Sequence, residues 1–249
     1  MTDIKTDILY GINPITEALK ASKRKCFRII LEEGKSNPRL KSLIKFVQLQ
    51  NIKVEIISKS QFKKRYLPYT HQGIVGYFSI KSSITLDNLI SNALEESEHP
   101  ILVLVDGIQD PHNLGAIIRS AEAMGVQGIV LPKHRVAPLN ETVAKCSSGA
   151  IEKLPVTYVT NLATTIEQFK KSGFWIVGID PEGETPCHDF KFEMPVVILV
   201  GSEGKGIRPL LKKNCDYILS IPMTGSMSSL NASAAGAIIF YEAFRQKTK

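Results

Sequence analysis

Short apolar segments alternate with helical patterns along most of the chain. Beyond residue 100, six segments rich in Val, Ile and Leu predict β-strands. They lie at residues 101–105, 129–131, 154–159, 175–179, 196–200 and 217–221. Apolar residues at helical spacing predict helices at 113–124, 161–171 and 207–213. Strands that alternate with helices in this way are typical of a mainly parallel α/β sheet.

A smaller α/β unit is predicted at residues 8–80. Strands are expected at 27–31, 54–57 and 73–78, and helices are expected to begin near Asn13, Asn37 and Ser58, since Asn and Ser cap helices well. The stretch that follows is polar, with an acidic run and one weak helical pattern. We therefore predict a first domain at 1–80, a linker at 81–99 and a second domain at 100–249.

Composition narrows the class of protein. No apolar run has the length of a membrane span, and the N-terminal sequence lacks the apolar core of a signal peptide. We therefore expect a cytoplasmic protein with no membrane partner. Cys26, Cys146, Cys187 and Cys215 are scattered, without a CxxC pair or a cluster of His partners. This pattern predicts reduced thiols, no disulfide framework and no metal site.

The positive charge is concentrated in the first third of the chain. Residues 1–80 hold 15 Lys and Arg against 6 Asp and Glu, whereas the remainder carries a net charge of −2. Such asymmetry predicts a module that binds RNA, although a merely solvated basic surface is the alternative. The candidate RNA contacts are Lys23, Arg24, Lys25, Arg28, Lys63, Lys64 and Arg65. Tyr66 and Tyr69 stand beside the second cluster, as suits RNA phosphates and unstacked bases.

In open α/β sheets, ligands bind at the carboxyl ends of strands, and three predicted strand ends carry unusual residues. After the first, Asn113 is a good helix cap, and Arg119 projects off the apolar stripe of the helix. A guanidinium there suits a phosphate, while a surface position is the alternative. The second, at 201–207, lacks the Ser or Thr that a Walker A motif needs after its Lys. Glu203 in it could contact substrate or cap a helix.

The third stretch, at 220–245, opens at a strand end and continues through a loop of Gly, Ser, Thr and Met into a helix that begins with Ala, Ser and Gly. Small residues allow a ligand or another segment to approach the backbone closely. The polar candidates are Ser228, Ser229 and Asn231, and the apolar ones are Ile221, Met223 and Leu230. With no Lys or Arg between Asp216 and Tyr241, this mixture suits a nucleoside-like ligand. A Ser/Gly-rich surface loop is the alternative.

Together, the three stretches resemble the three motifs of the SpoU (TrmH) family of RNA ribose 2′-O-methyltransferases. The motifs appear as PHNLGAIIRSAEAMGV at 111–126, VILVGSEGKGI at 197–207 and IPMTGSMSSLNASAAGAIIFYE at 221–242. Residues 8–80, with GINPITEAL and HQGIVGYF, resemble the N-terminal substrate-binding module of this family, which has an L30e-like α/β fold.

The resemblance implies a C-terminal α/β trefoil-knot (SPOUT) methyltransferase domain. It also implies S-adenosylmethionine as co-substrate, no metal, and a homodimer with active sites across the interface. By motif position it assigns Asn113, Arg119, Glu203, Ser229 and Asn231 to the catalytic pocket. Gly201, Ile221 and Leu230 fall where the family holds the methyl donor, and Met223 and Ser228 are predicted beside them.

The resemblance also places Arg119 at the 2′-hydroxyl. Because a guanidinium is effectively always protonated, we expect Arg119 to clamp the adjacent phosphate and to stabilise charge on the 2′-oxygen, instead of acting as a base.

A guanosine of 23S rRNA is the expected target, since family members that modify position 18 of tRNA generally lack a module like residues 8–80. A tRNA ribose methyltransferase and a non-catalytic RNA-binding or ribosome-assembly protein are the alternatives. A dinucleotide-dependent oxidoreductase is excluded because no GxGxxG fingerprint follows a strand.

Overall fold

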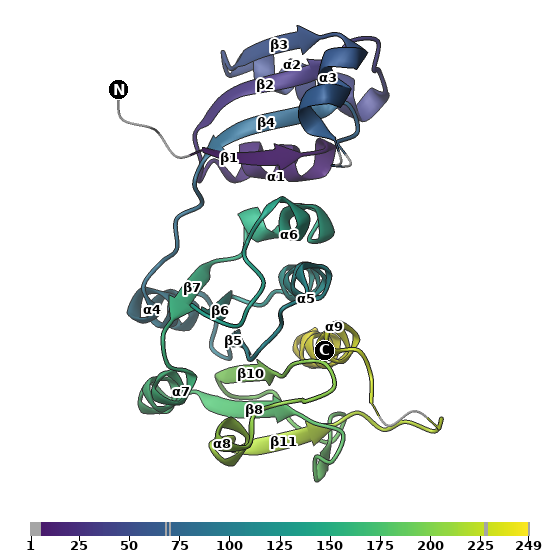
Figure 1. The fold of residues 1–249 in the computed structure, drawn as a ribbon. Coiled ribbons are helices and arrows are strands. Elements are labelled where there is room, and N and C mark those ends of the chain that lie inside the picture. Colours follow the sequence, from purple (N-terminus) through teal and green to yellow (C-terminus); the bar gives the residue numbers. More distant parts are fainter. Residues whose placement is uncertain (1–5, 68, 70, 227–228, 249) are drawn as a thin grey trace. The chain divides into compact units, whose positions relative to one another are not determined.

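The computed structural model describes residues 6–67, 69, 71–226 and 229–248, which form two compact units (Figure 1). The first comprises the described residues up to Ser82 together with Leu139–Lys153. The second comprises Ser83–Pro138 and the described residues from Leu154 onward. A segment from the middle of the chain thus belongs with the N-terminal part, which the sequence-based boundaries did not anticipate.

The first unit is built on a four-stranded sheet in the order β1-β4-β2-β3. Its strands are β1 (Thr6–Tyr10), β2 (Cys26–Glu32), β3 (Lys53–Ile57) and β4 (Ile74–Ser79), and its helices are α1 (Ile12–Ala21), α2 (Pro38–Leu49), α3 (Lys59–Tyr66), α6 (Glu141–Cys146) and the short 3₁₀ helix η1 (Ala150–Glu152). β2 and β3 run parallel, whereas β4 is antiparallel to both β1 and β2. The three predicted strands are confirmed, but β1 was missed because it opens with the polar Thr6 and Asp7.

Arg24 lies inside this first unit. Its side chain is only 3% exposed, and its Nη1 donates to Oε1 of Glu152, itself 2% exposed, at 3.0 Å. Its Nη2 donates to Oδ2 of Asp7 at 2.6 Å, and its Nε donates to the carbonyl of Ser79 at 2.7 Å. All three guanidinium nitrogens are therefore engaged, and the prediction that Arg24 contacts RNA is corrected: it is a structural residue.

The second unit is built on a seven-stranded sheet in the order β7-β6-β5-β10-β8-β11-β9. Its strands are β5 (Ile101–Val105), β6 (Gly128–Pro132), β7 (Val156–Val159), β8 (Trp175–Ile179), β9 (Thr185–Pro186), β10 (Val196–Val200) and β11 (Tyr217–Ser220). Every pairing in it is parallel, which confirms the predicted sheet. Because β10 lies beside β5, strand ends that are distant in sequence meet at one edge.

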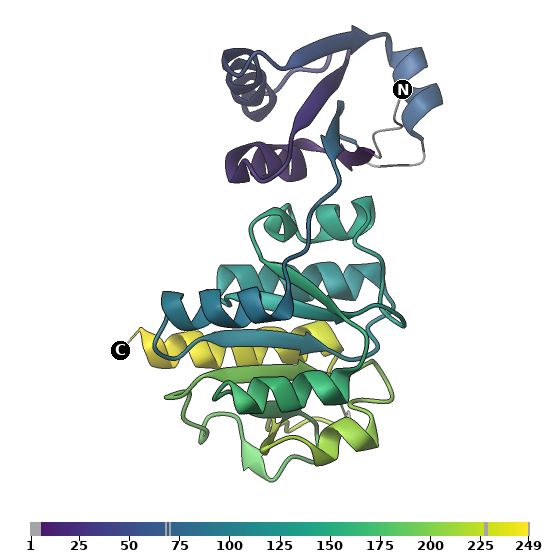
Figure 2. The same ribbon diagram turned by 90° about the vertical axis from the view of Figure 1, so that its left-hand side faces the viewer.

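Helices cover both faces of this sheet. They are α4 (Leu86–Glu96), α5 (Pro111–Ala123), α7 (Leu162–Lys171), α8 (Pro209–Lys213) and α9 (Ala232–Lys247). α4, α7 and α8 pack on one face (Figure 2). There they bury the side chains of Leu102, Leu104 and Leu199. α5 and α9 pack side by side on the opposite face.

The predicted linker is also corrected. Leu89, Ile90 and Ala93 of α4 are part of the buried core of the second unit. Most of residues 81–99 are therefore not a solvated spacer, because the helix presents an apolar face to the sheet. Among the described residues, no helix has both the length and the apolar character needed to cross a membrane.

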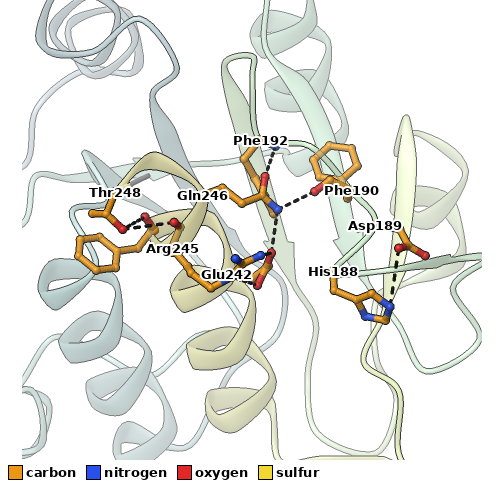
Figure 3. Close-up of polar contacts among 9 residues, drawn as sticks. His188, Asp189, Phe190, Phe192, Glu242, Arg245, Gln246 and Thr248 are labelled. Atoms are coloured by element: carbon orange, nitrogen blue, oxygen red, sulfur yellow. Dashed lines mark hydrogen bonds and ion pairs between the residues drawn. The ribbon is translucent and has the colours of Figure 1, made fainter.

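The C-terminal end of α9 is fixed by the amide of Gln246 (Figure 3). Its Oε1 accepts the N–H of Phe192 at 3.0 Å, and its Nε2 donates to the carbonyl of Phe190 at 2.9 Å. The same Nε2 donates to Glu242, whose carboxylate also accepts from Arg245, and these bonds lower the pKa of Glu242. This end of the helix is thus tied to the loop before β10.

Replacing Arg24 tests its structural role. Arg24→Ala would leave Glu152 buried without its guanidinium partner, so we expect the first unit to lose about 3–5 kcal/mol of unfolding free energy. Hydrogen–deuterium exchange should rise at residues 139–153 and in β1. Lys25→Ala, an exposed neighbour, is the matched control. Wild-type exchange at 139–153 in Arg24→Ala would contradict the assignment.

Candidate functional site

The carboxyl ends of β5 and β10 form one edge of the second unit. The N–H of Asp106, directly after β5, donates to the carbonyl of Val200 at 2.9 Å. The loop of residues 106–110 therefore starts beside the loop of residues 201–207. The N-terminus of α9 meets both loops, so all three predicted stretches converge at this edge.

Asn231 joins the three stretches. It is the N-cap of α9, and its Oδ1 accepts the N–H of Ser233 at 2.9 Å. Its Nδ2 donates to Oδ1 of Asn113 at 3.0 Å and also to Oε1 of Glu203. The structure thus brings together Asn113, Glu203 and Asn231, as a shared pocket requires.

The cap of α5 differs from the prediction. The helix begins at Pro111, and Asp110 is its N-cap, with its carboxylate accepting the N–H of His112 at 3.1 Å. Asn113 lies inside the first turn, which leaves its side chain available to Asn231.

The loop of residues 201–207 is folded tightly on itself. Ser202 and Gly206 exchange two backbone hydrogen bonds, of 3.0 and 2.9 Å. A Cβ at Gly201 would lie 2.3 Å from the carbonyl carbon of Gly206, so no other residue fits this position without moving the backbone. Gly206 has a φ of +63°, in the left-handed region. The loop therefore presents its backbone and Glu203 at the edge of the sheet.

A cavity of about 640 Å³ lies between this loop and the start of α9. Of the predicted donor and catalytic residues, it is lined by Gly201, Glu203, Ile221, Met223, Ser229 and Leu230. Ser228 lies outside the described residues. Val200 and Ala235 add apolar wall, and Asp180 and Glu182 add carboxylates. Apolar walls with carboxylates suit a nucleoside-like ligand that carries positive charge.

A second cavity, of about 700 Å³, lies on the other side of Glu203. It is lined by Asn113 and Glu203 together with residues that the sequence analysis did not single out, chiefly Asp106, Arg135 and Arg208. A polar residue directly after a fully buried strand was the available signal for Asp106. Arg135 and Arg208 lie outside the three motifs and carried no comparable signal.

Arg119 lies apart from both cavities. It is exposed on α5 and lines neither of them. The structure therefore does not bring Arg119 together with Asn113, Glu203 and Asn231 within one chain.

The predicted basic residues of the first unit, apart from Arg24, are exposed. Arg28 and Arg65 approach the same carboxylate, that of Glu55, at 4.0 and 3.9 Å, so the two predicted clusters meet there. The guanidinium of Arg28 also lies 4.2 Å from the ring centroid of Tyr77. Tyr66, predicted as a base contact, is buried and hydrogen-bonded to Tyr77. It therefore lies beneath the basic surface of the first unit instead of on it.

The thiols and the potential metal-binding side chains of the described residues indicate neither a reactive cysteine nor a metal site. Burial raises the pKa of Cys26 to about 11 and that of Cys215 to about 12, so both stay protonated near neutral pH. In the part of the chain that the structure describes, no three His, Cys, Asp or Glu side chains are grouped to hold a metal ion.

Two family models match the chain. Residues 100–241 match the SpoU rRNA Methylase family, and residues 8–83 match a module described as RNA 2′-O ribose methyltransferase substrate binding. The matches cover the two sequence regions that were predicted to be a methyltransferase domain and its substrate-binding module.

Named relatives are similar over nearly the full length. The chain is 38% identical to YacO of Bacillus subtilis, provisionally described as a TrmH family tRNA/rRNA methyltransferase, over 97% of this chain and 96% of that protein. It is 37% identical to the 23S rRNA (guanosine-2′-O-)-methyltransferase RlmB of Shewanella oneidensis, over 98% of each. The SpoU methyltransferase AviRb of Streptomyces viridochromogenes, solved with the cofactor AdoMet, superposes with a TM-score of 0.80 at 26% identity, over 98% of this chain and 91% of that one.

Asn231→Ala should loosen the site as well as the helix. Loss of an N-cap costs about 1 kcal/mol, and the bonds to Asn113 and Glu203 would be lost with it. We expect a lower melting temperature and faster hydrogen–deuterium exchange at residues 202–206. Asn161→Ala removes an N-cap of the same kind from α7 and should leave exchange at 202–206 unchanged. Equal exchange there in both variants would contradict the joining role of Asn231.

Proposed function

The chain belongs to the SpoU rRNA methylase family of RNA 2′-O-methyltransferases, and from this premise we propose that it methylates the 2′-hydroxyl of a guanosine in 23S rRNA, using S-adenosylmethionine. The observation that carries the proposal is the meeting of Asn113, Glu203 and Asn231 at the wall between two cavities. One cavity suits the methyl donor, and the other leaves room for a ribose. Such an enzyme would act in the cytoplasm, where ribosomes are assembled.

The choice of 23S rRNA rests on the first unit. A substrate-binding module matches residues 8–83, and the full-length similarity to RlmB includes it. Exposed cations on that unit suit RNA phosphates. A tRNA substrate stays as the alternative, since YacO is described for both kinds of RNA.

S-adenosylmethionine fits the 640 Å³ cavity. Ile221, Leu230 and Met223 would contact its adenosine, and Gly201 lets the loop of residues 201–207 fold tightly on itself as one wall of the cavity. Asp180, Glu182 and Glu203 bring carboxylates to the cavity, although Lys212 pairs with Asp180 at 3.0 Å and Lys205 also lines it, so Glu203 is the carboxylate left to face a cationic ligand. When bound, this donor supplies a methyl group already activated by the positive charge on sulfur.

The chain itself must orient the ribose and accommodate the charge that develops on the 2′-oxygen. Asn113, Glu203, Ser229 and Asn231 would position the sugar, so that much of the acceleration comes from orientation. A guanidinium, which stays protonated, would hold the neighbouring phosphate and stabilise the developing oxyanion. We assign that role to Arg119.

A homodimer would complete the site. Arg119 lines neither cavity of its own chain, and Ile238, Tyr241 and Phe244 form an exposed stripe at helical spacing along α9. Because α5 packs against α9, a second copy covering this stripe would lie close to the helix that carries Arg119. We therefore propose that each active site receives its arginine from the other copy.

A non-catalytic RNA-binding protein is the second candidate function. It is favoured by the basic first unit alone, and the convergence of the three motif stretches on one cavity argues against it. Calorimetric titration with S-adenosylmethionine separates the two, since only an enzyme needs the donor. Absence of donor binding would favour the second candidate. Ribose-methylation mapping of rRNA and tRNA from cells that lack the protein would identify the target.

Arg119→Ala should lower methyl transfer to unmodified 23S rRNA by about 100-fold or more, since one donor to a developing oxyanion contributes on this scale. The affinity for S-adenosylmethionine should stay within twofold of wild type. Lys171→Ala, an exposed lysine on α7, is the control and should transfer normally. Near-normal turnover by Arg119→Ala would reject the assignment.

Reversing the charge of Lys63, Lys64 and Arg65 to Glu should weaken binding of 23S rRNA at least tenfold and flatten its dependence on salt, because phosphate contacts release counterions. The same reversal of Arg39, Lys41 and Lys45 on α2 changes the net charge equally. This second triple variant should lose less affinity for 23S rRNA than the first, if α3 lies on the RNA-binding surface. Equal losses from the two triple variants would indicate a non-specific effect of charge.

A further inference from the structure

A groove that contains two arginines continues from the active site along the carboxyl ends of β5, β6 and β7. It consists of the 700 Å³ cavity next to Glu203 and an adjoining cavity of about 380 Å³. Both cavities are lined by Asp106, Gly107, Arg135 and Arg208. The second extends to Asn161 at the N-terminus of α7. Neither arginine belongs to the three motif stretches on which the proposed function rests.

Arg208 is held in a fixed orientation by the carboxylate of Asp106. The buried carboxylate of Asp106, only 4% exposed, accepts the backbone N–H of Arg208 at 3.1 Å and its Nε–H at 2.8 Å. Of the guanidinium's donors, only the Nε–H, nearest the chain, is used by Asp106. The side chain is nevertheless 50% exposed, and among the described residues its two terminal nitrogens have no recorded partner. Four N–H donors thus remain for a ligand, in the planar fork that suits phosphate oxygens.

Arg135 reaches the groove from the loop after β6. Its φ of +60° is uncommon for a residue other than glycine. The loop is fixed close by, since the N–H of Ala137 donates to the carbonyl of Ile108 at 2.9 Å. Lys205, from the loop after β10, lines the first cavity as well. Cations from two different loops, after β6 and after β10, therefore face one groove.

The carboxylates in the groove are already engaged. Asp106 binds Arg208, Asp110 accepts from the N–H of His112, and Glu203 accepts from Asn231. Among the described residues, neither Arg135 nor Lys205 forms an ion pair with a carboxylate. In the 380 Å³ cavity, Asp106 is the one carboxylate among the described lining residues, and it is paired with Arg208, so Arg135 leaves a net positive charge that favours an anionic ligand there.

We propose that Arg135 and Arg208 bind the RNA phosphodiester that flanks the methylated nucleotide, with Asp106 as the positioning residue of Arg208. The inference rests on the proposed function, because Asn113 and Glu203 mark where the target ribose would lie and also line the groove. A strand whose ribose occupies that place has its next phosphate within the same continuous depression. The contact is to the backbone, so it fixes the register of the RNA and does not read bases.

The experiment measures binding of a fluorescein-labelled 12-nucleotide single-stranded RNA of mixed sequence over a range of salt concentrations. Arg135→Ala should weaken binding about tenfold at low salt and lower the slope of log K against log salt by about 0.7, the value for one phosphate contact on a single strand. Arg208→Ala should do the same. Lys171→Ala, outside the groove, should match wild type, and S-adenosylmethionine affinity should be unchanged in all variants.

Asp106→Asn tests the positioning role. It keeps the size of the side chain but weakens the hold on Arg208, so RNA affinity should fall while the salt slope falls only in part. Arg208→Lys should not restore binding, because an ammonium group cannot be held through Nε while presenting a planar fork. A merely structural role would lower the melting temperature without changing the slope.

Wild-type affinity and slope in Arg135→Ala and Arg208→Ala would overturn the proposal. Arg208→Ala leaves Asp106 buried without its guanidinium and could be unstable, whereas Arg135 is exposed and provides the independent test. Failure of the proposed function is distinguished by a separate assay. If wild type transfers no methyl group to 23S rRNA but both variants lose slope, the phosphodiester site stands and the assigned reaction does not.

Discussion

The candidate site depends on one side-chain amide, that of Asn231. Its oxygen caps α9, and its nitrogen bonds to Asn113 after β5 and to Glu203 after β10. A cap residue that also bonds to two loops couples the position of a helix to the geometry of a pocket. At its other end, α9 is fixed by Gln246. The helix is thus held at both ends, and the loops are built against it.

Strand order places the two cavities. β5 and β10 are about a hundred residues apart in sequence, yet they pair directly, with Leu102 opposite Val197. Their carboxyl ends carry groups of opposite kind. Asp106 binds an arginine on the groove side, while Gly201 lets the loop on the donor side fold tightly against Gly206. Glu203 and Lys205 both line both cavities, so the wall between the proposed donor and substrate sites carries one charge of each sign.

The sequence predicted most of the fold and the residues that meet at Asn231. Buried strands such as β5 and β10 are continuous apolar runs, and the motif stretches have distinctive small residues. β1 and α6 were missed because they are short and open with polar residues, and α4 was taken for a linker because its exposed face is acidic. Arg24 was misassigned because composition cannot show that a cation in a basic cluster is paired with a carboxylate 128 residues away. The role of Arg208 could not be predicted from the sequence, because it depends on a contact with Asp106 that only the folded structure shows.

The first unit includes Leu139–Lys153, although the chain has left that unit at Ser82. This order matters for synthesis on the ribosome, which releases the chain from its N-terminus. Until residue 152 emerges, Arg24 lacks Glu152, one of the two carboxylates that it binds in the finished protein. The N-terminal unit therefore stays incomplete while residues 83–138 of the second unit are synthesised, and the surface that residues 139–153 later cover is exposed during that time. Folding of the two units is thereby linked in time, and a truncated product that ends before residue 139 cannot complete its first unit.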